Sequence, residues 1–514
     1  MGPRLIAKQL TISPPHLPAG LYTVEMLTDE EIIRANPWWR GQGWEAGDPH
    51  LQRLAGQPAR LPAPEVDAID LITPSLHIVR GPRQVGKSTD LKLIVQRSLR
   101  EGRRPESILY LALDLLEGQP FPELARTVRR AGQLAGVLSW GLILLDEVTT
   151  VPRWRLALKA LWDEGAIDRS VTICTGSSAV DLARAESESL AGRRGEGVDW
   201  LVLPQDLGAF ARAVVRSLPA PPGLDVEEMT SPDGQLLMLD MRRHLPDLRL
   251  ALERYLRFGG LPAAVAEASR GLAGPSEATR RVLHDSLLLE IRRKGASVPA
   301  ADALMERIMR SLGSRVSWQR MAEEMTVPLG GKRARHTTAT DRRTLQDYIQ
   351  LLATGYFALV VYFWRQDSGT ADLSKDKKVY FGDPLLHTIT ADRVGLAPDP
   401  HAQVENALAV HLFRRYEPQE RQPGTFAAPD RLHVWGTKTG GEIDFVCGPR
   451  SAIHAVEAAD WERLNRQKAT GPRRALPGRP SLVATKDHLE FSNSMNLVPA
   501  ALVLWALSGR QVRA

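Results

Sequence analysis

The chain has 514 residues, of which 43% are hydrophobic and 25% charged, and its formal net charge at pH 7 is +6. This composition excludes a largely disordered chain, and the length exceeds what one hydrophobic core can organise, so we expect several domains. The mild positive charge permits a nucleic-acid partner without requiring one. Only Cys174 and Cys447 are cysteines, and both stand in apolar runs. They indicate buried thiols in a reducing compartment and exclude a disulfide framework.

Targeting signals are not recognisable in the chain. Residues 1–10 lack the apolar segment and cleavage site of a secretory signal, and the most apolar stretch, Leu497–Leu507, is too short to cross a bilayer. We therefore expect a cytoplasmic protein without a membrane partner.

Composition divides the chain into five predicted segments. Residues 1–70 form an extension rich in Trp and Pro, and we expect Trp38 and Trp39 to pack on a neighbouring domain rather than stack on bases. In residues 71–217, apolar runs alternate with helical stretches, which predicts an α/β domain with a parallel sheet. Residues 218–313 are predicted as a linker or insertion and a helical, lid-like region. Residues 314–365 are predicted to be winged-helix-like and 376–514 to form an α+β domain.

The segment Gly81-Pro82-Arg83-Gln84-Val85-Gly86-Lys87-Ser88 matches the P-loop pattern G-x-x-x-x-G-K-[ST] at every fixed position. The apolar run Leu76–Arg80 precedes it and helical spacing follows it, so the loop is predicted between a strand and a helix N-terminus. Backbone N–H groups from Gly81 to Thr89 would bind the phosphates of ATP. Lys87 would reach the β- and γ-phosphates, and the Ser88 hydroxyl would coordinate Mg²⁺.

Two carboxylates follow the apolar run Leu142–Leu145, about sixty residues after the loop. Asp146 is predicted to hold the Mg²⁺ shell, and Glu147 to orient or deprotonate the attacking water. Further on, Arg193 has two interpretations. It either neutralises transition-state charge, in cis or from a neighbouring subunit of a homo-oligomer, or it is a solvated arginine of a turn.

Taken together, these motifs resemble a family of bacterial and archaeal AAA+-like ATPases that carry a C-terminal domain of unknown function. The resemblance rests on Gly81–Ser88, Leu144–Glu147, Thr175–Ser178 and Leu190–Arg193, and later on Phe258–Pro262, Tyr380–Pro384 and Glu442–Phe445. In ATPases of the AAA+ type, a polar side chain at the end of the strand between the two main motifs senses the γ-phosphate. The resemblance implies this role for Thr175 or Ser177, and the pleat register decides which points inward.

The helical middle of the chain has the order of a winged helix-turn-helix. A helix over residues 317–325 and another over Thr340–Thr354 precede a strand-like run, Phe357–Trp364. The connection between the helices carries several cations, and Arg342 and Arg343 begin the second helix. Residues 314–350 could therefore contact DNA phosphates, or the module could only pack domains together.

The last segment resembles the PD-(D/E)xK nuclease core, in which carboxylates on a helix and two strands bind Mg²⁺ and a lysine activates water. The matching acids are Glu405, Asp444 and Glu457, but Ala459 occupies the position of the lysine. A degenerate nuclease fold is therefore expected, with Lys438 and Lys468 as conceivable substitutes for the lysine.

The resulting prediction is an Mg²⁺-dependent ATPase whose hydrolysis moves its domains and could act on nucleic acid. Two alternatives stay open: a nucleotide-gated DNA-binding regulator in which slow hydrolysis is a timer, and an ATP-regulated, metal-dependent nuclease.

Overall fold

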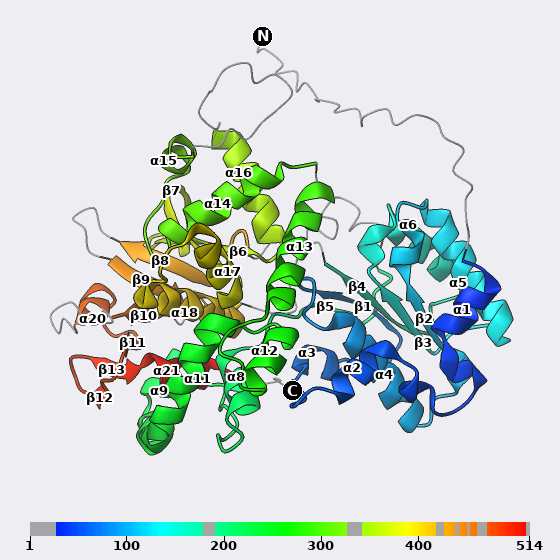
Figure 1. Cartoon of the computed structure of the whole chain (residues 1–514), viewed down its shortest axis with the longest axis horizontal. Coiled ribbons are helices and arrows are strands. Elements are labelled where there is room, and N and C mark those ends of the chain that lie inside the picture. Colours follow the sequence, from blue (N-terminus) through cyan, green and yellow to red (C-terminus); the bar gives the residue numbers. More distant parts are fainter. Residues whose placement is uncertain are drawn as a thin grey trace, which may run out of the picture.

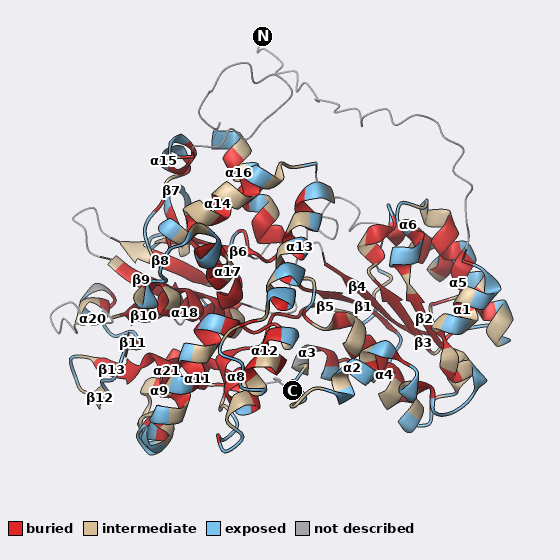
Figure 2. Cartoon of the chain, viewed as in Figure 1, coloured by how far each residue is buried: buried red, intermediate tan, exposed pale blue. Residues whose placement is uncertain are grey.

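The computed structural model describes residues 27–177, 190, 192–293, 295–325, 342–417, 426–436, 442–449, 453–459 and 470–509. Two β-sheets organise these residues. In Figure 1 a smaller α/β unit, coloured blue to teal, lies on one side of a larger unit, and the helix α13 (Glu277–Arg293) lies between them. Most strand residues of both sheets are buried (Figure 2).

The first sheet has five strands in the order β2-β3-β4-β1-β5, and all neighbours are parallel. Its strands are β1 (Ser75–Arg80), β2 (Ile108–Ala112), β3 (Leu142–Asp146), β4 (Val171–Gly176) and β5 (Asp199–Leu201), and helices α4 (Lys87–Arg100), α5 (Phe121–Ala135) and α6 (Trp154–Asp163) connect them. This is the predicted parallel α/β domain. Because β4 lies between β1 and β3, the carboxyl ends of the strands that carry the three main motifs meet at one edge of the sheet.

Part of the N-terminal extension packs on the edge strand β2. It contains α1 (Asp29–Ala35), α2 (Pro49–Ala55), α3 (Pro64–Asp67) and the short 3₁₀ turns η1 (Pro37–Arg40) and η2 (Trp44–Ala46). The indole N–H groups of Trp38 and Trp39 both donate to the carbonyl of Ile108, at 3.1 and 2.9 Å. Asn36 is buried and pairs with both backbone groups of Tyr110. The predicted packing role of the tryptophans is confirmed, and the extension covers an edge that would otherwise expose unpaired backbone groups.

Helices predominate between the two sheets. They are α8 (Leu207–Val214), α9 (Val226–Thr230), α10 (Pro232–Met241), α11 (Leu245–Phe258), α12 (Pro262–Ser269), α13, α14 (Val298–Arg310), α15 (Trp318–Glu323) and α16 (Arg342–Thr354). The predicted face of the last helix, namely Leu345, Tyr348, Ile349 and Leu352, is buried. The cationic connection before it, residues 326–341, lies outside the described residues.

The second sheet has eight strands in the order β12-β13-β11-β10-β9-β8-β6-β7 and is mixed. Its strands are β6 (Ala358–Arg365), β7 (Thr370–Phe381), β8 (Leu432–Gly436), β9 (Glu442–Cys447), β10 (His454–Ala458), β11 (Ser481–Thr485), β12 (Glu490–Phe491) and β13 (Asn496–Pro499), accompanied by α17 (Pro384–Val394), α18 (Pro400–Tyr416), α20 (Gly471–Ala475) and α21 (Ala500–Leu507). The hairpin β6–β7 follows α15 and α16 in the order predicted for a wing. However, β6 also pairs in parallel with β8. The hairpin is therefore continuous with the C-terminal sheet, and one apolar core extends from Leu201 to Leu507 through segments that the sequence analysis separated.

Two of the later motifs meet inside this unit. The Asp383 carboxylate accepts the backbone N–H of Gly260 and that of Leu385, both at 2.8 Å, and so joins the motif after α11 to the start of α17. Gly259 has φ +68°, and a Cβ there would lie 1.9 Å from an oxygen of Asp383. The close approach explains why glycine stands at this position. Burial raises the pKa of Asp383 to about 6.

Both cysteines are free and buried, as predicted, and burial raises the pKa of Cys174 to about 12. Among the helices of the described residues, none combines the length and apolar character that crossing a membrane would need.

Candidate nucleotide site

The P-loop turns sharply between β1 and α4. Gly81 has φ +156°, and a Cβ on it would lie 2.1 Å from the carbonyl oxygen of Val202, so the loop begins where two backbones nearly touch. Gly86, with φ +111°, is the N-cap of α4. Glycine adopts both conformations without steric cost, and the first turn of α4 then presents unpaired N–H groups for phosphate oxygens.

Lys87 is buried at the start of α4. Its ammonium donates to the carbonyl oxygens of Gly81 and Pro82, both at 2.9 Å, and lies 3.9 Å from a carboxylate oxygen of Glu147. Burial lowers the pKa of Lys87, while the carboxylates of Glu147 and Asp146 oppose that shift. The ammonium is therefore held inside the loop at the place where the motif predicts phosphate contacts.

Thr175 joins the two predicted catalytic acids. Its hydroxyl donates to Asp146, and its oxygen accepts the backbone N–H of Glu147 at 2.9 Å. Tyr110 donates to the other oxygen of Asp146 at 3.1 Å. Thr175 thus orients both acids. Ser177, the other member of the pair that the sequence left undecided, is also buried and donates to Glu290, so which of the two senses the γ-phosphate stays a prediction.

Glu147 adopts a left-handed backbone conformation with φ +54°, which costs a residue with a Cβ about 1–2 kcal/mol. One of its carboxylate oxygens is buried without a hydrogen-bond partner. Strain of this kind concentrates at functional positions, and an unsatisfied buried oxygen is a ready acceptor for water. Both features fit the predicted role of Glu147 towards an attacking water.

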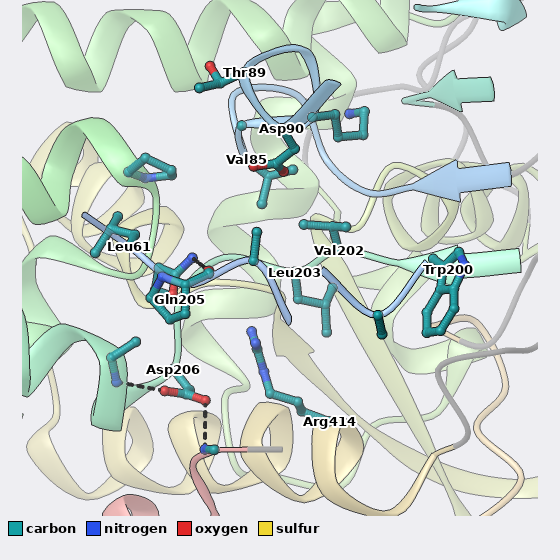
Figure 3. A pocket seen from close by; sticks show the side chains of 18 of the residues that line it. Leu61, Val85, Thr89, Asp90, Trp200, Val202, Leu203, Gln205, Asp206 and Arg414 are labelled. Atoms are coloured by element: carbon teal, nitrogen blue, oxygen red, sulfur yellow. Dashed lines mark hydrogen bonds between the residues drawn. The ribbon is translucent and has the colours of Figure 1, made fainter. Parts of the chain in front are cut away.

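A cavity of about 1290 Å³ opens beside the loop. Residues 83–89 and Glu147 line it together with the N-terminal extension, the strand end after β5 and the C-terminal unit. Figure 3 shows Val85, Thr89 and Asp90 on one side of the cavity, with Leu61 and Leu203 nearby and Arg414 reaching in from α18. The space therefore suits a ligand that combines phosphates with an apolar part.

Glu290 enters this site from α13, although no sequence pattern singled it out. Its carboxylate accepts from Arg83 at 3.1 Å and from Ser177 at 3.3 Å, across 207 and 113 residues of chain. Glu290 is 5% exposed. Glu290 is one of several acids in α13, so the sequence does not distinguish it from the others, and only the docking of α13 assigns it a contact.

Arg193 lies elsewhere. Its guanidinium forms an ion pair with Asp163 at the end of α6, at 2.7 Å, and Arg193 is not among the residues that line the cavity. Because Asp163 is exposed, this pair holds Arg193 only weakly. A role of Arg193 in hydrolysis stays a prediction.

Two of the predicted acids of the C-terminal segment, Glu405 and Asp444, contact a lysine that no sequence motif singled out. Lys378 on β7 is 1% exposed, and its ammonium lies 2.8 Å from oxygens of Glu405, Glu442 and Asp444. Tyr380 donates to the same oxygen of Glu405 at 2.7 Å. Burial alone would lower the pKa of Lys378, but the carboxylates of Asp444, Glu405 and Glu442 outweigh burial and raise it. Burial, together with Asp444, raises the pKa of Glu405 to about 7.

Glu457 lies at the edge of this cluster, where it accepts the backbone N–H of Asp444 at 3.2 Å. The second oxygen of Asp444 accepts the N–H of Ala458 at 2.9 Å. Lys438 and Lys468 lie outside the described residues. Within the part of the chain that the structure describes, no group of His, Cys, Asp and Glu side chains has the arrangement of a metal site.

Comparison with known proteins identifies two regions of the chain. A family model described as AAA domain matches residues 73–206, and a model described as a domain of unknown function, DUF8612, matches residues 249–392. No curated protein matches the chain.

Solved structures similar to the chain include the ORC2 protein of Aeropyrum pernix in ADPNP–ADP complexes, with 13% identity over 73% of this chain and 97% of that chain and a TM-score of 0.28. The ADP form of the same protein has 11% identity, covers 70% and 94%, and has a TM-score of 0.28. A structure from a study of katanin self-assembly has 17% identity, covers 39% and 73%, and has a TM-score of 0.20. Scores of this size do not establish a shared overall fold. The AAA match coincides with the parallel sheet and its P-loop, and residues 73–206 are accordingly an AAA-type P-loop domain.

Proposed function

We propose that the chain binds and hydrolyses ATP at the carboxyl edge of the five-stranded sheet. The observation that supports this most directly is the convergence of four residues, from the start of α4 and from the ends of β3 and β4, that hydrogen bonds and an ion pair link to one another: Lys87, Asp146, Glu147 and Thr175. Phosphate binding alone would need only the loop. The pair of oriented acids opposite the lysine is what hydrolysis adds.

The residues present fit a bound Mg²⁺ ion. The Ser88 hydroxyl opens the first turn of α4, and the Asp146 carboxylate at the end of β3 is held by Thr175 and Tyr110. Mg²⁺ would supply charge neutralisation for the phosphates. In the proposed reaction Lys87 exchanges the loop carbonyls for phosphate oxygens, and Glu147 orients the water through its unpaired oxygen. Thr175 holds Asp146 and Glu147 in position while charge is redistributed on the phosphate during the reaction.

Two substitutions test this proposal. Lys87→Ala should weaken ATP binding at least tenfold and abolish turnover, because it removes the buried ammonium that would contact the β- and γ-phosphates. Glu147→Gln should bind ATP with an affinity close to that of the original protein and stop turnover, because the amide cannot accept the proton of water. Phosphate release and the binding of a fluorescent ATP analogue measure both effects. Normal turnover by Glu147→Gln would contradict the assignment of the water-orienting acid.

A nucleotide-gated DNA-binding regulator is the second candidate function. It is supported by Arg342 and Arg343, which are exposed at the start of α16. Fluorescence anisotropy of a labelled DNA duplex, with and without ATP, tests this candidate. Binding that strengthens with ATP, falls with salt and weakens in the double variant Arg342→Ala/Arg343→Ala would support a regulator. Strong stimulation of turnover by DNA would favour a remodelling ATPase instead.

The nuclease alternative finds less support in the cluster around Lys378. The buried ammonium lies 2.8 Å from an oxygen of each of three acids and offsets part of their negative charge, so a metal ion would have to compete with it for these carboxylates. Plasmid nicking in Mg²⁺ or Mn²⁺ that disappears in Asp444→Ala would revive the nuclease proposal. Gel filtration with and without ATP would show whether Arg193 could act on a neighbouring subunit.

A further inference from the structure

Three polar groups around the P-loop could donate hydrogen bonds to a terminal phosphate. Two of them already donate to one carboxylate from outside the ATPase domain. Arg83 lies in the loop itself, and Ser177 follows β4, the strand whose end is predicted to sense the γ-phosphate. Lys87 lies beside them. Glu290 on α13 accepts hydrogen bonds from Arg83 and Ser177 with a single oxygen.

We propose that Glu290 makes the site discriminate between nucleotides by their number of phosphates, and that a γ-phosphate displaces Glu290 and so moves α13. This inference rests on the proposed ATP site. A carboxylate and a phosphate oxygen need the same donors, and Arg83 recognises both in the same planar geometry. The two anions also repel each other at close range, so binding both at the same donors is unfavourable.

Arg83, a hydrogen-bond donor to Glu290, can bind a phosphate instead. A terminal nitrogen of Arg83 is buried without a hydrogen-bond acceptor, while its Nε binds Glu290. The guanidinium is therefore only partly satisfied by Glu290, and a phosphate offers more acceptor oxygens than one carboxylate oxygen supplies. An ADP molecule, which ends at the β-phosphate, would leave the Glu290 contact in place.

The acceptor side belongs to a different part of the fold. Leu283, Leu287 and Ile291 of α13 are buried in the core of the larger unit, whereas Glu290 extends from the same helix to the ATPase domain. Figure 1 shows α13 between the two units. α13 also packs against α14, which leads towards the second sheet. Loss of the Glu290 contact would therefore release a helix that is anchored in the other unit, which is a direct route from nucleotide to domain movement.

The test compares Glu290→Gln with Asp285→Asn, a matched change at an exposed acid on the same helix. Titration with fluorescent ATP and ADP analogues measures both affinities. Glu290→Gln should tighten ATP binding about tenfold and change ADP binding less than twofold, while Asp285→Asn changes neither. Glu290→Ala, which removes the acceptor altogether, should show the same preference.

Hydrogen exchange of α13 provides a second readout. In the original protein, ATP should accelerate exchange in this helix relative to ADP, and in Glu290→Gln the two nucleotides should give equal exchange. Equal ATP and ADP shifts in affinity, or an α13 that is indifferent to the nucleotide, would overturn the inference. If the original protein binds ATP and Lys87→Ala does not, such a result would refute only the role of Glu290. If the original protein binds no ATP, the proposed function itself fails.

Discussion

Replacing Lys378 with methionine tests how the C-terminal unit tolerates buried charge. Methionine keeps much of the length and apolar volume of the lysine stem but removes the ammonium, so Glu405, Glu442 and Asp444 lose a partner that lies 2.8 Å from each of them. Removing one member of a buried ion pair typically costs about 3–5 kcal/mol, because the remaining charges are left uncompensated. Here three carboxylates are affected, so we expect a loss at the upper end of that range at pH 8.

Lowering the pH should restore part of the stability that Lys378→Met loses. The pKa of Glu405 is already raised, to about 7, and loss of the ammonium would raise it further. A carboxyl whose pKa is higher in the folded than in the unfolded chain binds its proton preferentially when folded. Lowering the pH therefore stabilises the folded form, by about 1.4 kcal/mol per pH unit until the unfolded value near 4.5 is reached. The difference between the variant and the original protein should shrink as the pH falls from 8 to 6.

Hydrogen exchange of peptides from β7 and β9 measures this effect locally, which matters because a chain with several hydrophobic core clusters need not unfold in one step. A loss of about 3–5 kcal/mol corresponds to exchange that is roughly 10²- to 5 × 10³-fold faster. Lys375→Met is the matched control. It lies on the same strand, its side chain is 53% exposed, and its nearest acid is 3.9 Å away, so it should cost less than about 1 kcal/mol. If Lys378→Met exchanges no faster than Lys375→Met, or if acid does not slow its exchange, Lys378 does not balance the charges of the cluster.

Three further changes test the ATPase domain and its contacts. Thr175→Val removes the hydroxyl between the two acids and should lower turnover at least tenfold with little loss of ATP affinity, whereas Thr175→Ser should retain activity; phosphate release measures both. Asn36→Ala breaks two buried hydrogen bonds to Tyr110 and should destabilise the ATPase domain by about 2–4 kcal/mol. This loss would appear as a lower midpoint of urea unfolding, and an unchanged midpoint would argue that the extension docks independently. Burial lowers the pKa of His411 to about 4, so below pH 6.5 the unfolded chain binds a proton at His411 that the folded chain does not bind. The folded form therefore becomes less stable as the pH is lowered. Between pH 7 and 5 the original protein should lose about 2 kcal/mol more than His411→Gln, and parallel pH curves would contradict this.

Local patterns in the sequence were sufficient to predict the phosphate-binding loop and the parallel sheet that carries it. Gly81, Gly86, Lys87 and Ser88 define a phosphate-binding loop by their identity and spacing. Apolar runs that alternate with helical stretches predict parallel strands whose carboxyl ends meet at one edge of the sheet. The positions of Asp146 and Glu147 after β3 follow from the same reasoning. The packing role of Trp38 could also be predicted, because large aromatic side chains contribute most when buried.

The tertiary structure decided which side chains meet across long distances. The choice of Thr175 as the residue that joins the two acids required the register of β4 between β1 and β3. Glu290 and Lys378 gave no sequence signal, because a single acid on a helix or a single lysine on a strand resembles any solvated residue until a neighbouring element buries it. Their partners lie 27 to 207 residues away along the chain. Sequence periodicity reports which face of an element is buried, but the contacts of a buried charge depend on how helices and sheets dock, and that information exists only in the folded chain.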